Sequence, residues 1–408
     1  MRFSSCLGSN LVTSLVCSPK HPAGPTATNM GLAIFIIAVA FCLYTLVGYP
    51  LLLGVLARRG SKPVREFQPL SVTVLLPVRN GERWIAAKLD CIQALDYPPE
   101  LIGTLVISDD STDGTDDIVR AYAAKSAVRL IRVPQGGKAA ALNAGMQQAA
   151  GEVLFFTDVR QQLESGSLRE LISRFADPKV GAVSGELLIL DGSTRESANL
   201  GLYWRYEKWI RKQMSQIDSF HGVTGSIYAL RRSLAVEIPP DTLNDDMYIP
   251  LHAFLRGYRI AFEERARATD FPTLLDAEFR RKVRTLAGVV QIVCMLPALL
   301  GPRNRMWFHF MSHKIARLLL PYAILAATVS SFWLPWPWAA VALACQALIY
   351  GLAAVDAFLP SHHGLRRLSS PIRTFLVMMA ATMCAASILF VPPGKLWKET
   401  KVVDAKAK

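Results

Sequence analysis

Residues 106–115 read VISDDSTDGT: a run of apolar, β-forming residues ends abruptly in carboxylates, hydroxyls and a glycine. This is the pattern of a buried parallel strand that delivers polar side chains to the carboxyl edge of a sheet, where open α/β sheets bind their ligands. Residues 153–158 repeat the pattern with the sequence VLFFTD. Two strands that end in carboxylates within one domain predict a site for a diphosphate and its metal ion at this edge.

Strand and helix patterns alternate around these two motifs. We expect strands at 71–78, 101–108, 128–133 and 153–157, separated by helices at 82–94, 113–124 and 138–149. Alternation of this kind predicts an α/β domain with a parallel sheet covered by helices on both faces.

Long apolar segments flank the α/β domain in a chain of 408 residues with a net charge of +13. Residues 31–56 carry no charge and are long enough to cross a bilayer. Arg58 and Arg59 follow at once, so the positive-inside rule places the α/β domain in the cytosol. Further spans are expected at about 315–334, 338–359 and 372–391. Because the basic residues gather beside apolar segments, the positive charge favours a membrane protein over a nucleic-acid-binding one.

The sequence divides into six expected segments. These are an unassigned segment 1–29, a transmembrane helix 30–58, the cytosolic domain 62–285, an interfacial helix 286–305, a membrane domain of about three helices 314–394, and a basic tail 395–408. A full crossing by the last span would put the basic tail outside, so either that span is re-entrant or interfacial, or the positive-inside rule fails there. The cysteines show no C-x-x-C spacing, and we expect neither a disulfide framework nor a zinc site.

Two further loops carry candidate ligand-binding residues. Pro77 and Arg79 follow the first strand, where a loop can contact a nucleotide base. Residues 136–145, GGKAAALNAG, open a helix with two glycines, so backbone N–H groups and Lys138 are available to a phosphate. The spacing is not that of a P-loop, and a turn of this kind is more often only a turn.

The order of these motifs resembles the family 2 glycosyltransferases, specifically the membrane-embedded branch of cellulose, chitin and hyaluronan synthases. The resemblance covers about residues 40–300 well and the membrane tail loosely. It implies that the α/β domain has the Rossmann-like fold of a nucleotide-diphospho-sugar transferase, with transmembrane helices attached.

The resemblance assigns the two carboxylate-tipped strands to the sugar donor. In that family an aspartate after the second strand binds the base and ribose; here Asp109 aligns best, and Asp110 stands in the usual place of a glycine. A D-x-D motif at the fourth strand binds metal and diphosphate, which makes Asp158 the expected ligand of Mg²⁺ or Mn²⁺. The second aspartate of that motif is replaced by Arg160, which would weaken the dependence on metal.

The general base and the diphosphate clamp are implied by two later motifs. The family's T-E-D motif reads Asn244-Asp245-Asp246 here, so Asp246 is the expected base with Asp245 in support. The same residues also fit a helix N-cap. The Q-x-x-R-W motif keeps only its arginine, Arg284, which with Arg281 would hold the leaving diphosphate.

An acceptor side is implied by a loop and the helix before it. Thr224, Gly225 and Ser226 resemble the family's acceptor-side loop. Trp204 and Trp209 lie in an aromatic, basic helix just upstream, where they would either stack on sugar rings or anchor the helix at the membrane interface.

The resemblance implies an inverting glycosyltransferase that extends a polysaccharide from a nucleotide sugar at a bacterial inner membrane, in contact with membrane lipids and with no nucleic-acid partner. The Trp of the Q-x-x-R-W motif is replaced by Thr285, which favours one alternative: transfer of a single sugar to a lipid such as polyprenyl phosphate or a ceramide. A second alternative is an inactive subunit that only binds nucleotide sugar. The donor sugar, the acceptor and the linkage are not given by the sequence.

Overall fold

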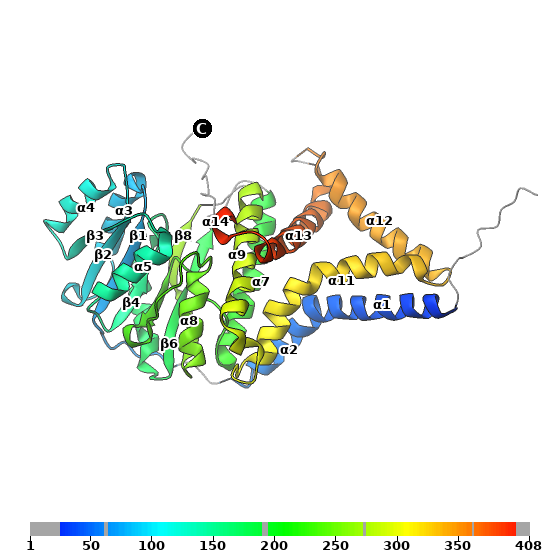
Figure 1. Cartoon of the computed structure of the whole chain (residues 1–408), viewed down its shortest axis with the longest axis horizontal. Helices are drawn as coiled ribbons and strands as arrows, with labels where there is room; N and C mark the ends of the chain where they lie inside the picture. Colours follow the sequence, from blue (N-terminus) through cyan, green and yellow to red (C-terminus); the bar gives the residue numbers. More distant parts are fainter. Residues whose placement is uncertain (1–24, 61–63, 190–194, 272–274, 361–362, 397–408) are drawn as a thin grey trace, which may run out of the picture.

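The computed structural model describes residues 25–60, 64–189, 195–271, 275–360 and 363–396. An α/β domain forms one end of the molecule, and a set of long helices extends from it to the other (Figure 1). Of the segments predicted from the sequence, residues 1–24 and 397–408 lie outside the described part.

A mixed sheet of eight strands, in the order β3-β2-β1-β4-β7-β6-β8-β5, organises the α/β domain. The four predicted strands are β1 (Val72–Val78), β2 (Ile102–Asp109), β3 (Val128–Val133) and β4 (Val153–Phe156). They pair in parallel, as expected.

The sheet continues with four strands that the sequence pattern did not reveal, and these make it mixed. They are β5 (Gln162–Leu163), β6 (Val180–Ile189), β7 (Tyr228–Arg231) and β8 (Arg259–Asp270). β7 runs antiparallel to both β4 and β6. The helix between β6 and β7, α7 (Arg195–Ile217), packs on α2 (Tyr49–Ala57). α7 also contacts β8, so it packs against both the sheet and α2.

Helices cover both faces of the sheet. On one face lie α3 (Glu82–Gln93), α4 (Thr115–Ala123) and α6 (Ser167–Ile172); on the other lie α5 (Gly137–Gln148) and α8 (Asp245–Leu255). A hydrophobic core lies on each face of the sheet: the first core is under α3, α4 and α6, and the second core is under α5 and α8. Successive strand residues point to opposite faces, so Val74 and Leu76 pack in the first core and Leu75 packs in the second. This double burial explains why the parallel strands read as continuous apolar runs.

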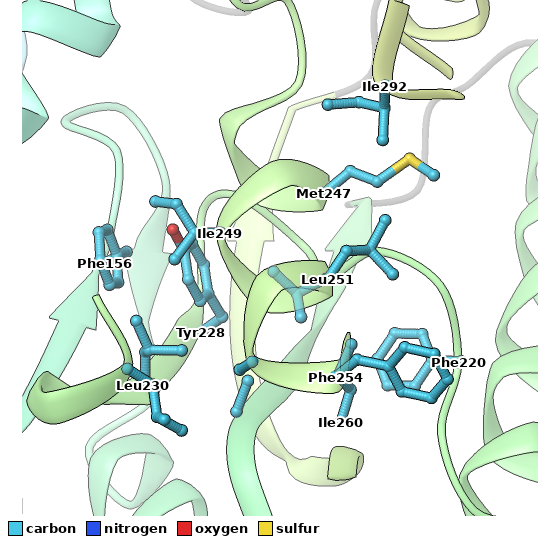
Figure 2. Close-up of a cluster of buried hydrophobic side chains, with 14 of the residues drawn as sticks. Phe156, Phe220, Tyr228, Leu230, Met247, Ile249, Leu251, Phe254, Ile260 and Ile292 are labelled. Atoms are coloured by element: carbon cyan, nitrogen blue, oxygen red, sulfur yellow. The ribbon is translucent and has the colours of Figure 1, made fainter. Parts of the chain in front are cut away.

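The second core is continuous with the long helices. Figure 2 shows Phe156 and Tyr228 of the sheet beside Ile249 of α8, with Ile292 of α9 (Leu275–Met295) above Met247. The same cluster includes residues of α2 and α7. The α/β domain and the adjoining helices are therefore held together by one shared hydrophobic core.

Four helical stretches are long and apolar enough to cross a membrane: Thr28–Ala57, Trp307–Trp333, Trp338–Asp356 and Arg366–Leu389. They contain α1 (Pro25–Leu43), α2, α10 (Trp307–Phe310), α11 (Ala316–Ser330), α12 (Trp338–Asp356) and α13 (Arg366–Ala385). Short π-helical segments at Tyr44–Gly48 and Met311–Ile315 join α1 to α2 and α10 to α11. Other short helices lie at Pro99–Leu101, Ser173–Ala176, Arg232–Leu234, Pro297–Leu300, Ser331–Trp333, Ala386–Leu389 and α14 (Pro393–Leu396). α1 lies along α11, and α13 packs against α9 and α12 (Figure 1).

The expected boundary at residues 285 and 286 falls inside a helix. α9 runs from Leu275 to Met295 and contains the basic run 280–284 together with residues 286–295 of the predicted interfacial helix; a short helix follows at Pro297–Leu300. No proline interrupts α9, and arginine, lysine and leucine are good helix formers, so the two segments join.

Candidate active site

The loops after β1 and β2 are tied together at the carboxyl edge of the sheet. Asn80 and Asp110 adopt left-handed backbone conformations, with φ of 49° and 51°. The Asn80 carboxamide oxygen accepts a hydrogen bond from the backbone N–H of Thr112, at 2.8 Å. Asn and Asp tolerate this conformation, which explains how Asp110 replaces the usual glycine. Pro77 lies inside β1 and is half-buried, so it does not follow the strand as expected; Arg79 comes just after the strand and is exposed.

Asp109 fixes the double-glycine turn. Its buried carboxylate accepts the backbone N–H of Gly136, at 2.7 Å, and of Gly137, at 3.1 and 3.2 Å from its two oxygens. These two N–H groups are thus hydrogen-bonded to Asp109, and phosphate binding by the turn stays a prediction. Contact of Asp109 with a base and ribose stays a prediction. Its neighbour Asp110 is more exposed and pairs with Arg132 at 2.9 Å.

Lys138 joins two of the predicted carboxylates. Its Nζ lies 3.1 Å from Oδ1 of Asp158, just after β4, and 3.3 Å from Oδ2 of Asp245, in the first turn of α8. Burial alone would lower the pKa of Lys138, but Asp158, Asp245 and Asp246 raise it well above its ordinary value. The ammonium therefore stays charged and holds the end of β4 against the start of α8.

Asp246, the residue predicted as the general base, lies in the first turn of α8. Burial and the neighbouring Asp245 raise its pKa to about 6. A Cβ placed on Gly225 would lie only 3.0 Å from Oδ2 of Asp246, so the acceptor-side loop and this carboxylate are in contact. Asn244 makes no side-chain cap and instead donates to the carbonyl of Thr285, at 2.8 Å. Asn244 therefore stands at the N-cap position of α8, as the alternative interpretation expected, but its side chain does not cap the helix.

Arg284 comes to the same place from α9. Burial lowers its pKa, while the carboxylates of Asp246, Asp245 and Asp158 raise it, so its guanidinium lies in the field of all three. Arg281, one turn earlier, makes a bidentate pair with Glu278 at 2.7 and 2.9 Å. A diphosphate contact by Arg281 stays a prediction.

The predicted acceptor-side residues lie in two different environments. Thr224 accepts a hydrogen bond from Arg211 at 3.0 Å, and the carbonyl of Ser226 accepts one from Thr157 at 2.9 Å, next to Asp158. The Trp204 ring lies 5.1 Å from the Arg281 guanidinium. Trp209 instead lies beside Gly54 of α2 and is 39% exposed; both proposed roles of Trp209 stay predictions.

Lys88 is a positioning residue that the sequence analysis missed. Its fully buried Nζ donates to Oγ1 of Thr157 at 2.8 Å and to the carbonyl of Gln161 at 2.5 Å, on either side of Asp158. Burial lowers the pKa of Lys88 to about 8. The sequence contained a sign of this role, because residue 88 falls on the apolar face of α3 with Ile85, Leu89 and Ile92, where a lysine must be buried.

Arg160 turns away from Asp158. Its guanidinium pairs at 2.5 Å with Asp270, at the end of β8, and Gln161 donates to the same carboxylate oxygen at 2.8 Å. The replaced D-x-D residue therefore anchors the loop after β4 to the end of β8.

The arrangement does not fit a divalent ion held mainly by protein carboxylates. Within the described ranges no three His, Cys, Asp or Glu side chains gather in a metal-binding group. Asp158 and Asp245 share the Lys138 ammonium, and the second D-x-D position is the arginine paired with Asp270. Mg²⁺ or Mn²⁺ at Asp158 stays a prediction.

Two family models match the chain. The model for glycosyl transferase family 2 matches residues 73–238, and that for glycosyl transferase family group 2 matches residues 161–355. Together they span the sheet, the candidate site and two of the four candidate membrane spans.

Curated relatives and solved structures agree with these matches. The chain is 26% identical over 355 residues to an N-acetylglucosaminyltransferase of Rhizobium meliloti, covering 80% of this chain and 82% of the relative. It is 25% identical over 228 residues to the poly-beta-1,6-N-acetyl-D-glucosamine synthase of Staphylococcus aureus, and spans only 54% of that protein. A Pyrobaculum calidifontis mannosyltransferase, solved with GDP-Man and Mn²⁺, superposes with a TM-score of 0.69 at 23% identity, over 89% of this chain and 99% of its own. This last likeness establishes the fold alone.

Proposed function

We propose that this chain, which belongs to glycosyltransferase family 2, moves a sugar from a nucleotide-diphosphate donor to a growing polysaccharide at a membrane, with inversion at the anomeric carbon. The observation that carries the proposal is the convergence of Asp246, Lys138 and Arg284 beside Asp158. These four side chains come from four separate elements. If each were only a helix cap or a surface charge, there would be no reason for them to lie together.

The proposed reaction assigns each charged group one task. The acceptor hydroxyl gives its proton to Asp246 as its oxygen attacks the anomeric carbon. The bond from that carbon to the diphosphate oxygen breaks, and Arg284 and Lys138 stabilise the charge on the departing diphosphate. Attack opposite the leaving group turns an α-linked donor into a β-linked product. A divalent ion, where present, would add positive charge to the diphosphate, with Asp158 as its protein ligand.

A bacterial inner membrane is the proposed location, with the α/β domain in the cytosol. Support comes from the four apolar helical stretches and from Arg58 and Arg59 at the end of the first. The core shared between the sheet and α2, α7 and α9 would place the acceptor-side loop close to the membrane. Membrane lipids are then part of the protein's surroundings.

The donor and acceptor are proposed from the names of the relatives and from one residue that differs from the Q-x-x-R-W motif. The names of the bacterial relatives make a nucleotide-activated N-acetylglucosamine the first donor to test, and a polysaccharide the first product. Thr285, in the place of the motif's Trp, favours the second candidate, transfer of one sugar to a lipid acceptor. An inactive binding subunit is disfavoured by the raised pKa of Asp246 beside Arg284.

The test is product analysis with purified full-length protein in nanodiscs. A panel of nucleotide sugars is offered with membrane lipid extract, and products are read by mass spectrometry. We expect a ladder of sugar additions from one donor, lost in Asp246→Asn and kept in the exposed control Asp241→Asn. A single addition to a lipid would establish the alternative, and no transfer from any donor would contradict the proposal.

A further inference from the structure

The Lys138 ammonium lies where a divalent ion shared by two carboxylates would lie. It is 3.1 Å from Asp158 and 3.3 Å from Asp245, so one positive group already bridges the end of β4 and the start of α8. A metal ion bound by the same oxygens would sit about 2.0–2.6 Å from each, within the same gap. The two cations therefore compete for one position.

The turn directly before Lys138 is held in place by Asp109. The carboxylate of Asp109 takes the backbone N–H groups of Gly136 and Gly137, directly before Lys138. Lys138 then lies in the first turn of α5, a helix that packs on β1 and β2. Its backbone position is set by the sheet itself, so the ammonium does not depend on a loop to reach the carboxylates.

The end of β4 has also lost a carboxylate. Arg160 stands at the second acidic position and faces Asp270, where Gln161 shares the same oxygen. Only Asp158 is left at this strand end to hold a metal ion. Asp245, the other carboxylate in contact with the same ammonium, is already held by Lys138.

Charges of opposite sign meet around the site. The carboxylates of Asp158, Asp245 and Asp246 interact electrostatically with cationic side chains, among them Lys138, Arg284 and Arg211. An entering diphosphate would therefore meet at least two cationic groups, Lys138 and Arg284, whose positions need no added ion. Lysine binds phosphate as a compact charge on a flexible stem, so the ammonium can contact both diphosphate and carboxylate.

We propose that Lys138 is the resident cation of the donor site, in place of a divalent ion, and that a nucleoside diphosphate binds this protein without any divalent ion. The inference rests on the proposed function, because it concerns the same donor site. It changes the expected cofactor requirement: Mn²⁺ or Mg²⁺ becomes dispensable for donor binding.

The test is isothermal titration of UDP and GDP into the full chain in nanodiscs, once with EDTA and once with Mn²⁺. For the nucleotide that binds, we expect the wild-type affinities in the two buffers to agree within about threefold. Lys138→Met should bind roughly 10- to 100-fold more weakly in EDTA, because a charge-assisted hydrogen bond is lost. Mn²⁺ should restore much of that loss, since the gap between Asp158 and Asp245 is then open. The exposed Lys125→Met is the matched control and should behave as wild type.

Electron paramagnetic resonance of Mn²⁺ gives a second readout, independent of nucleotide. Wild-type protein should leave the free Mn²⁺ signal unchanged, and Lys138→Met should reduce it by binding the ion. An unchanged thermal unfolding midpoint in Lys138→Met shows that the variant is folded.

The outcomes separate the inference from the proposed function. If the wild-type protein binds the nucleotide at least tenfold more tightly in Mn²⁺ than in EDTA, the inference is overturned and the proposed function is left intact. The inference would also be overturned if Lys138→Met lowered the nucleotide affinity by the same factor in EDTA and in Mn²⁺. Failure of folded wild-type protein to bind either nucleotide in either buffer would overturn both.

Discussion

Gly225→Ala should slow sugar transfer without weakening donor binding, because the added methyl group would press on the proposed base. The new Cβ would lie 3.0 Å from Oδ2, 3.3 Å from Cβ and 3.4 Å from Cγ of Asp246. Comfortable carbon–oxygen contacts are about 3.3–3.6 Å, so the carboxylate must retreat by roughly 0.3–0.5 Å. The backbone φ of Gly225 is not in the left-handed region, so alanine itself is tolerated there.

The size of the effect follows from how closely a base must approach its proton. A general base works within about 2.6–3.2 Å of the hydroxyl, and a 1 Å misplacement costs about 100-fold in rate. A shift of roughly 0.3–0.5 Å then predicts a loss of about 5- to 10-fold in kcat. Asp246→Asn, which removes the base, should cost about 10²- to 10⁴-fold.

The assay compares initial rates of transfer and nucleoside diphosphate affinities for Gly225→Ala and a control. The control is Gly166→Ala, where a new methyl group would meet no atom within 4 Å. We expect a slower rate and unchanged nucleotide affinity for Gly225→Ala alone. If Gly225→Ala transfers sugar as fast as Gly166→Ala, the assignment of Asp246 as the base is refuted.

Three other predictions concern pH, the guanidinium and packing. Because Asp246 has a pKa of about 6 and must be ionised to accept a proton, kcat/KM should fall about tenfold per pH unit below 6 and level off above it; a flat pH–rate profile through this range contradicts the assignment. Arg284→Lys keeps the charge but loses the planar fork, so kcat/KM should drop roughly 10- to 100-fold, against little change for the exposed Arg280→Lys. Gly288→Ala would place a methyl group 2.4 Å from the Asn244 side chain and should destabilise the fold by about 1–3 kcal/mol, measured by chemical denaturation; an unchanged midpoint would show that α8 and α9 separate easily.

The first half of the sheet was predictable because its physical origin is local. β1 to β4 are buried on both faces, so each appears as an unbroken apolar run, and glycine or aspartate marks where it ends. The predicted bounds of these strands and of α3, α4 and α5 agree with the structure to within two residues.

β8, in the second half of the sheet, was hidden by buried polar residues. β8 contains Glu263, which is fully buried and pairs with Arg65 at 3.2 Å, and ends at Asp270, which holds Arg160. A pattern of apolar residues cannot reveal a strand whose charges are neutralised by partners more than a hundred residues away. β5 consists of only two residues and has no pattern of its own.

The site likewise contains residues that could be predicted from local motifs and contacts that could not. Asp158, Asp246 and Arg284 each stand at a motif position, so their meeting could be predicted from the order of motifs. The bridge from Lys138 to Asp158 and Asp245 could not, because it depends on how α5, β4 and α8 are set against one another. The role of Asp109 in holding the turn before Lys138 is hidden for the same reason.

A cryo-electron microscopy structure of the full chain with bound nucleoside diphosphate addresses the central claim most directly. We predict diphosphate oxygens within about 3.5 Å of both the Lys138 ammonium and the Arg284 guanidinium, with the Asp246 carboxylate facing the side from which an acceptor would attack. A nucleotide bound elsewhere, or a diphosphate in contact with neither cation, would contradict the mechanism.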